Sequence, residues 1–137
     1  KSVDAGVFFG ADAGNPDNIG HFFADIQMYT TGAGEPDAIA HLCQYVSAEA
    51  SQAENEWRGN NNMRWQNDEF DATCEQALTS TDADERRDLA LKLNDLIIED
   101  YAMIPLVARP RVAGAATGYE PSGWDSEMWD IANWYME

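Results

Sequence analysis

Residues 81–107 read TDADERRDLALKLNDLIIEDYAMIPLV and carry the longest helical repeat in the chain. Asp82 and Glu85 have the spacing of a capping box, which predicts the start of a helix. Apolar residues then recur at helical spacing, at Leu89, Leu93, Leu96 and Ile97. This pattern predicts one amphipathic helix of about five turns. Because Pro105 cannot continue a helix, we expect the apolar run from Met103 to Ala108 to be a short buried strand.

Two further helices are predicted upstream of this stretch. Asn67 can cap one of them, which has acidic residues in its first turn and a buried stripe of Phe70, Cys74, Ala77 and Leu78. Residues 80–82 separate it from the long helix, which predicts an αα-hairpin. Pro36 opens the other helix, whose apolar side holds Ile39, Leu42, Cys43 and Val46.

The remaining segments predict strands and one short helix. Apolar and polar residues alternate weakly over residues 1–10 and again over residues 25–31, which predicts two strands. Between them, Asn15 followed by Pro16 opens a short helix that reaches Phe23. Another strand is expected over residues 111–116. The predicted fold class is therefore α/β (α+β), with a mixed sheet flanked by helices.

The charge of the chain limits its partners. Its 137 residues include 25 acids and 8 bases, for a net charge of −17. A field of this sign repels phosphate backbones and anionic lipids, so we expect no nucleic-acid partner. No apolar run approaches the roughly 20 residues of a membrane helix, and Lys1 does not open a signal-peptide pattern. We expect a soluble chain whose export signal, if it has one, lies outside it.

Catalytic patterns are weak. His21 and His41 are isolated from each other, and GxSxG, HExxH, P-loop and GxGxxG patterns are absent. Asp12, Asn15 and Asp17 have some likeness to a calcium loop, but the EF-hand spacing fails. We therefore predict a protein that is not an enzyme and needs neither cofactor nor metal. A small hydrolase is the alternative, and it requires two close carboxylates in one cleft.

Two stretches suit the binding of a solute, because aromatic faces and a few fixed polar groups line such pockets. Residues 29–32 leave a predicted strand at a glycine, and residues 57–65 combine indoles, guanidiniums and amides. The predicted pocket wall is Tyr29, Thr31, Gly32, Trp57, Asn61, Arg64 and Trp65. Two structural alternatives stay open: the tryptophans form a small core under the loop, and Arg64 makes a salt bridge.

Four segments together resemble a known family. They are RWQNDEFDATCEQAL, DLIIEDYAMIPLV, VDAGVFFGADAGNPDNIGHFFADIQMYTTG and SEMWDIANWYME. In order and spacing they are similar to the C-terminal part of the family 5 extracellular solute-binding proteins, the peptide, nickel and oligosaccharide receptors of ABC importers. The resemblance covers nearly the whole chain. Because family members are several times longer, it implies the C-terminal lobe segment of a two-lobed, periplasmic-binding-protein-like fold.

This resemblance implies partners, location and domain organisation. The solute would bind between this lobe and an N-terminal lobe missing from the chain, in an extracytoplasmic compartment, for delivery to a membrane permease. Residues 1–118 would form the partial lobe, and residues 119–137 would pack back on the other lobe. The alternative function is a stand-alone interaction module that docks through its aromatic C-terminus, residues 127–137.

Two further expectations follow from the resemblance. Peptide-binding relatives carry an aspartate for the peptide amine at the position that aligns with Gly32, so an oligosaccharide fits this chain better than an oligopeptide. Export would permit a disulfide between Cys43 and Cys74, whereas two buried free thiols on helix faces are the alternative.

Overall fold

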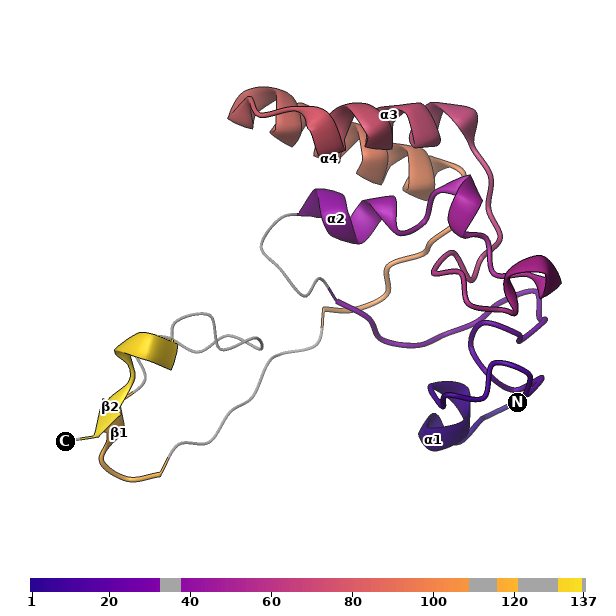
Figure 1. The fold of residues 1–137 in the computed structure, drawn as a ribbon, viewed down its shortest axis with the longest axis horizontal. Helices are drawn as coiled ribbons and strands as arrows, with labels where there is room; N and C mark the ends of the chain where they lie inside the picture. Colours follow the sequence, from indigo (N-terminus) through magenta and orange to yellow (C-terminus); the bar gives the residue numbers. More distant parts are fainter. Residues whose placement is uncertain (33–37, 109–115, 121–130, 137) are drawn as a thin grey trace.

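Three helices pack against one another along the upper edge of the view in Figure 1. They are α2 (Ala38–Cys43), α3 (Asp68–Thr79) and α4 (Ala83–Glu99). Helices α3 and α4 run antiparallel as the predicted αα-hairpin, and α2 lies against both. This computed structural model describes residues 1–32, 38–108, 116–120 and 131–136.

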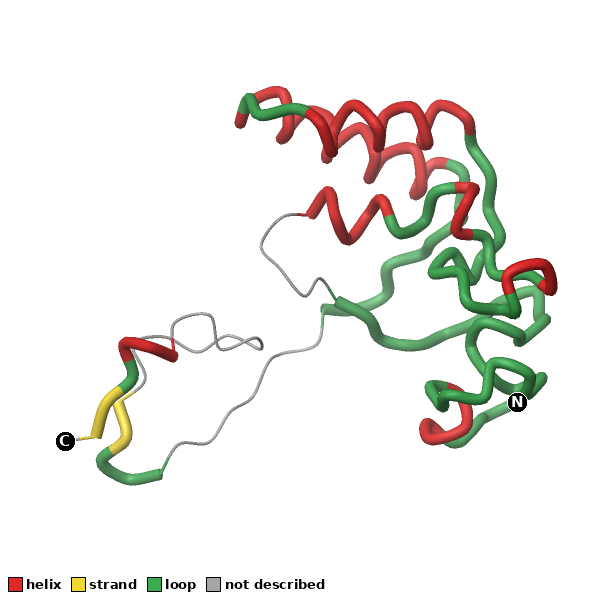
Figure 2. The backbone as a smooth tube through the Cα atoms, in the orientation of Figure 1, coloured by secondary structure: helices red, strands yellow, loops and turns green. Residues whose placement is uncertain are grey.

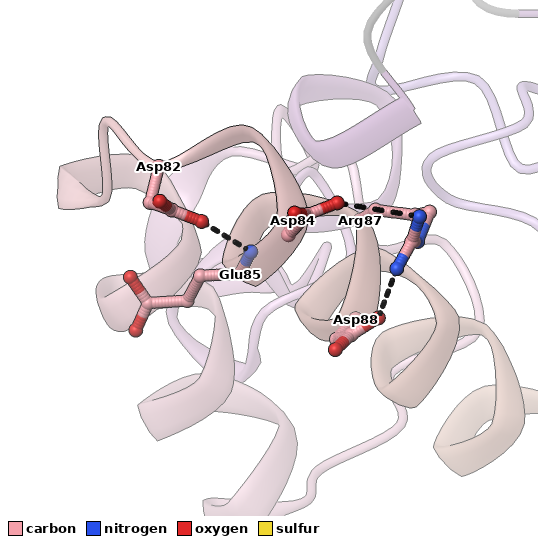
Figure 3. A network of polar contacts seen from close by, with 5 residues as sticks. All are labelled: Asp82, Asp84, Glu85, Arg87 and Asp88. Atoms are coloured by element: carbon pink, nitrogen blue, oxygen red, sulfur yellow. Dashed lines mark hydrogen bonds and ion pairs between the residues drawn. The ribbon is translucent and has the colours of Figure 1, made fainter.

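The start of α4 confirms half of the predicted capping box. A carboxylate oxygen of Asp82 accepts a hydrogen bond from the backbone N–H of Glu85 at 2.8 Å (Figure 3). The Glu85 carboxylate does not return to Asp82. It accepts instead from the Ser80 hydroxyl and from Gln76 Nε2 at 2.9 Å, and these bonds hold the pKa of Glu85 below its usual range. Glu85 therefore fastens the start of α4 to the end of α3.

Surface ion pairs add little to this hairpin. Arg87 lies 3.4 Å from Asp84 and 3.3 Å from Asp88, and all three side chains are exposed (Figure 3). Lys92 of α4 reaches Glu69 of α3 at 2.7 Å, also at the surface. Exposed pairs of this kind contribute about 0 to 1 kcal/mol each.

Helix α4 ends earlier than Pro105 would require. Tyr101 takes a left-handed conformation with φ 54°, its N–H bonds to the carbonyl of Ile98, and the N–H of Ala102 bonds to that of Ile97. These two bonds form a Schellman motif. The predicted buried strand after it is wrong, because residues 103–108 form no strand and their apolar side chains are mostly exposed, including Ile104, Leu106 and Val107 at 63%, 72% and 77%.

Helix α3 begins as predicted. The side chain of Asn67 accepts a hydrogen bond from the N–H of Phe70 at 3.0 Å, which satisfies one of the free donors at the helix start. Phe70, Cys74 and Ala77 are buried, as their spacing predicts. Leu78 is 58% exposed, so its place in the predicted stripe is wrong.

The core is an apolar cluster shared by the three helices. It consists of Ile39, Tyr45, Phe70, Cys74, Ala77, Leu89, Leu93 and Ile97. A disulfide between Cys43 and Cys74, with Cα atoms 5.6 Å apart, joins α2 to α3. Free thiols, the alternative left open by the sequence, are therefore not what the structure contains. A helix as short as α2 is not stable by itself, so the core and the disulfide hold it.

The surroundings of a histidine on α2 disfavour its charged form. Burial lowers the pKa of His41. The amide nitrogen Nε2 of Gln44 lies 3.0 Å from His41 Nδ1 and can only donate, so Nδ1 accepts and carries no proton. Protonation of this imidazole therefore opposes folding.

The N-terminal third does not form the predicted strand and helix. Residues 5–8 form a single helical turn, α1 (Ala5–Phe8), and the segment from Asn15 to Phe23 is a series of turns. The cause is a run of short acidic and amide side chains that accept from the backbone N–H two residues further on. The bond from Asp4 to Gly6 caps α1, whereas those from Asp12 to Gly14, Asn15 to Asp17 and Asn18 to Gly20 close turns. Such turns compete with both helix and strand.

The predicted mixed α/β sheet is wrong, because the regular elements of the described residues are mostly helices, joined by long loops (Figure 2). Its strand ladder pairs β1 (Tyr119–Glu120) with β2 (Tyr135–Met136), antiparallel, next to a 3-10 turn over Ile131–Asn133. Residues 25–31 are not assigned to a strand or paired in a ladder. Alternation defines two faces but does not supply a neighbouring strand. Residues 111–115 of the last predicted strand lie outside the described residues, and the division at residue 118 stays a prediction.

Reduction of the disulfide should destabilise the helices. The disulfide between Cys43 and Cys74 closes a loop with a sequence separation of 31, so loss of this bond should lower the free energy of unfolding by about 3 to 4 kcal/mol. Urea unfolding with and without dithiothreitol measures this change. The Cys43→Ala/Cys74→Ala double variant, as control, should not respond to the reductant. An identical urea midpoint for the oxidised and reduced wild type would contradict a stabilising role.

The neutral state of His41 should appear in the pH dependence of stability. Its pKa is lower in the folded chain than the ordinary value of 6.5, so the unfolded chain binds more protons just below that pH. The free energy of unfolding should fall as the pH drops from about 7.5 to about 5.5. Urea midpoints at both pH values test this, and His41→Gln should reduce the pH dependence. An equal dependence in the wild type and the variant would contradict it.

Candidate functional site

The loop that connects α2 to α3 is fastened from inside by Asn61. This residue is fully buried, and its Nδ2 lies 3.0, 3.2 and 2.7 Å from the carbonyl oxygens of Tyr45, Val46 and Trp65. Its backbone pairs with residues 49–51. Asn61 therefore lies in the interior of the loop and not in a pocket wall.

Arg64 ties this loop to the N-terminal segment. Its Nε donates to the carbonyl of Ser51 at 2.6 Å and its Nη2 to that of Gly20 at 2.8 Å. Its Nη1 reaches the carbonyls of Phe22 at 3.4 Å and Asn62 at 3.3 Å. Among the described residues, the polar partners of Arg64 are these four carbonyls and no carboxylate. The alternative that Arg64 makes a salt bridge is therefore wrong. Partial burial lowers the pKa of this guanidinium.

Around Arg64 the structure gathers three rings, which we call the aromatic platform: His21, Phe23 and Trp57. The His21 and Trp57 rings stack with centroids 4.1 Å apart and an angle of 14° between their planes. Phe23 meets Trp57 edge to face at 5.6 Å, and the Arg64 guanidinium lies 4.1 Å from the Phe23 centroid. Phe23 is 68% exposed, so the platform reaches the surface.

The backbone under the platform is strained and closely packed. Glu56 and Trp57 have φ values of 56° and 62°, and Arg64 has 56°. A left-handed conformation costs about 1 to 2 kcal/mol for a residue with a side chain. A Cβ on Gly20 would lie 2.3 Å from the Trp57 carbonyl oxygen, so the two segments touch where only glycine fits. The close approach of Gly20 therefore holds the backbone of Trp57, and such backbone strain often marks a functional site.

Trp65 lies apart from the platform, in the small core under the loop. Its indole N–H donates to Asp100 at 3.1 Å, beyond the end of α4. Its ring meets the buried ring of Phe70 edge to face at 4.9 Å. Trp65 therefore fits the alternative in which a tryptophan forms part of a small core under the loop.

The pocket residues predicted in the N-terminal segment also lie away from the aromatic platform. Tyr29 packs on Phe8 and Phe9, with ring centroids 5.8 and 6.2 Å apart. Thr31 and Gly32 are exposed, and a Cβ on Gly32 would meet nothing within 4 Å. Of the residues expected to line one pocket, Trp57 and Arg64 bring their side chains together, with the guanidinium 5.7 Å from the Trp57 ring. Asn61 bonds to Arg64 through the backbone at 3.2 Å, but its side chain is turned to the carbonyls of Tyr45, Val46 and Trp65.

His21 and Phe23 belong to the platform but were not among the predicted pocket residues. Both lie in the segment predicted as a short helix from Asn15 to Phe23. In the structure Phe22 instead approaches Phe8 at 6.2 Å, while its two neighbours turn toward Trp57. Alternation with a period of two through residues 21–23 is the signal that could have identified them.

Other kinds of site are not supported by the described part of the chain. It contains no group of His, Cys, Asp and Glu side chains that could hold a metal ion. A shallow hollow beside α3 is lined by Ala72, Glu75, Gln76, Leu78 and Thr79. Glu75 is its single acid, whereas glycoside hydrolysis needs two. None of the described helices has the length and apolar character needed to cross a membrane.

Comparison with protein families, with curated proteins and with solved structures found no match for this chain.

The role of Asn61 can be tested against its neighbour Asn60. Asn61→Ala leaves buried carbonyls without a donor and should lower the free energy of unfolding by about 1 to 3 kcal/mol. Asn60 is exposed, and its side-chain amide donates to the carboxylate of Glu49 at 3.1 Å, so Asn60→Ala should change the free energy of unfolding by less than about 0.5 kcal/mol. Urea unfolding of both variants provides the comparison. Equal losses would show that Asn61 does not hold the loop.

Proposed function

We propose that this chain is part of a solute receptor of an ABC importer. The receptor binds a small solute, an oligosaccharide or an oligopeptide, between two lobes and presents it to a membrane permease, without making or breaking bonds. The observation that carries the proposal is the aromatic platform. Its rings are fixed before any ligand arrives, and Phe23 is 68% exposed. Preorganised aromatic surfaces of this kind suit solute binding.

An exposed apolar surface supports a second lobe. In residues 25–31 the side chain of Tyr29 packs on the chain, whereas Ile26 and Met28 are 78% and 80% exposed. Residues 104–107 add further exposed apolar side chains. Exposed apolar side chains of this kind are available to an interaction partner. The N-terminal lobe that the receptor proposal requires would cover it.

The disulfide supports an extracytoplasmic location. Disulfides form and persist in oxidising compartments and are rare in the cytosol. Cys43 and Cys74 form such a bond, and Cys74 is buried in the core. The proposed receptor would therefore work outside the cytoplasm, in the periplasm or at the cell surface.

A second candidate function is a protein-interaction module that docks through its C-terminus. Ile131 and Tyr135 are each 55% exposed, which favours a partner for this segment. Removal of residues 127–137 should abolish docking but leave the helical core folded. In a receptor the same segment packs on the other lobe.

The receptor proposal can be tested on the product of the complete gene that contains this chain. Calorimetry with maltotetraose and tetraalanine should give a Kd on the order of micromolar for one of them, with compaction in small-angle X-ray scattering as the lobes close. The 137-residue chain alone should bind at least about 100-fold more weakly, because it supplies one wall of the site. Micromolar binding by the chain alone, or absence of closure with both solutes, would contradict the proposal.

A further inference from the structure

We propose that the exposed part of the Phe23 side chain binds an uncharged ring of the solute, as found in a sugar, and that Arg64 is a positioning residue and not an anion receptor. This inference rests on the proposed receptor function and assigns the substrate class of the same site. It depends on which groups of the platform remain available to a ligand.

The polar edges of the Arg64 guanidinium are already occupied. A carboxylate is gripped by two N–H groups that lie side by side. Along one edge, Nε and Nη2 donate to the carbonyls of Ser51 and Gly20 at 2.6 and 2.8 Å. At the other edge, Nη1 lies near the carbonyls of Phe22 and Asn62. A bidentate grip on an anion would break these bonds, which join two segments of the chain.

Phe23 provides the stacking surface. The guanidinium of Arg64 lies over its ring at 4.1 Å, and the residue is 68% exposed, which leaves part of its side chain open to solvent. Trp57 is half-buried, with one face stacked on His21 and its ring met by Phe23. A hydrogen bond between His21 Nδ1 and the Gly14 carbonyl at 3.1 Å orients the imidazole. Trp57 and His21 thus support the platform, and Phe23 contacts the ligand.

The charges near the platform favour a neutral ligand. The net charge of −17 repels anions, and the nearby cation of Arg58 pairs with Glu56 at 3.2 Å. A cationic ligand on Phe23 would face the Arg64 cation across the ring, and the two charges would repel each other at short range. This repulsion outweighs the attraction of more distant acidic residues, because salt screens that attraction. A sugar ring carries no charge, and its C–H groups stack on an aromatic face.

NMR titration of the 137-residue chain tests the inference, with maltotetraose, succinate and choline each at about 20 mM because one wall binds weakly. Maltotetraose should shift the ring signals of Phe23 and the indole N–H signal of Trp57, which packs against it, and succinate and choline should shift neither. In Phe23→Ala the response is read from the Trp57 indole signal, and it should be abolished. The matched control is Phe9→Ala, which removes a ring that is 56% exposed in the other aromatic cluster, and it should keep the response. Persistence of the response in Phe23→Ala, or a response to succinate or choline in place of maltotetraose, would overturn the inference.

Arg64→Lys separates positioning from anion binding. Lysine keeps the charge but loses the planar fork, so the ring-current shifts of Phe23 and Trp57 should change before any ligand is added. The affinity for maltotetraose should fall by at least about five-fold. An anion receptor would instead show succinate binding in the wild type.

The two proposals fail in different ways. If none of the three probes shifts Phe23 while the complete receptor still closes on a solute, this inference is wrong and the receptor proposal stands. If the complete receptor does not close, the receptor proposal is wrong whatever Phe23 binds.

Discussion

Burial of one side of α4 is the interaction on which the rest of the structure depends. Leu93 and Ile97 are almost fully buried against α3 and α2, and each contributes about 1.5 to 3 kcal/mol through the apolar surface removed from water. Helix α2 is too short to persist by itself, so it exists because this surface and the disulfide hold it. The buried surface of α4 and the disulfide therefore also determine where the loop after α2 lies.

The aromatic platform is a consequence of that position. Asn61 fixes the loop to the end of α2, and Arg64 then reaches across to the carbonyls of the N-terminal segment. These bonds, together with the close approach at Gly20, bring Trp57 to His21 and Phe23. The Arg64 guanidinium thus positions the rings by binding the backbone carbonyls of both segments. This explains how a chain with so little regular structure in its N-terminal third can present an ordered group of rings.

The helices were predictable because their signals are local. Asn67 and Asp82 cap helices through bonds within one turn, and the spacing of Leu89 and Leu93 identifies the buried side of α4. The strands were predicted from alternation, and that reasoning failed. Residues 25–31 alternate and are not helical, but a strand also needs a neighbour, which no local pattern provides. The short helix from Asn15 failed for another reason, since side chains there bond to their own backbone as turns.

By itself the sequence determined where α3 and α4 lie, which faces they bury, the strongly negative charge and the chemical richness of residues 57–65. Only the tertiary structure decided which of those residues meet. It placed Asn61 in the interior, packed Trp65 against the core, joined the cysteines, and added His21 and Phe23 to Trp57. The physical reason is range: capping and periodicity act within a few residues, whereas the Arg64 bonds to Gly20 and Phe22 span more than forty positions of the chain.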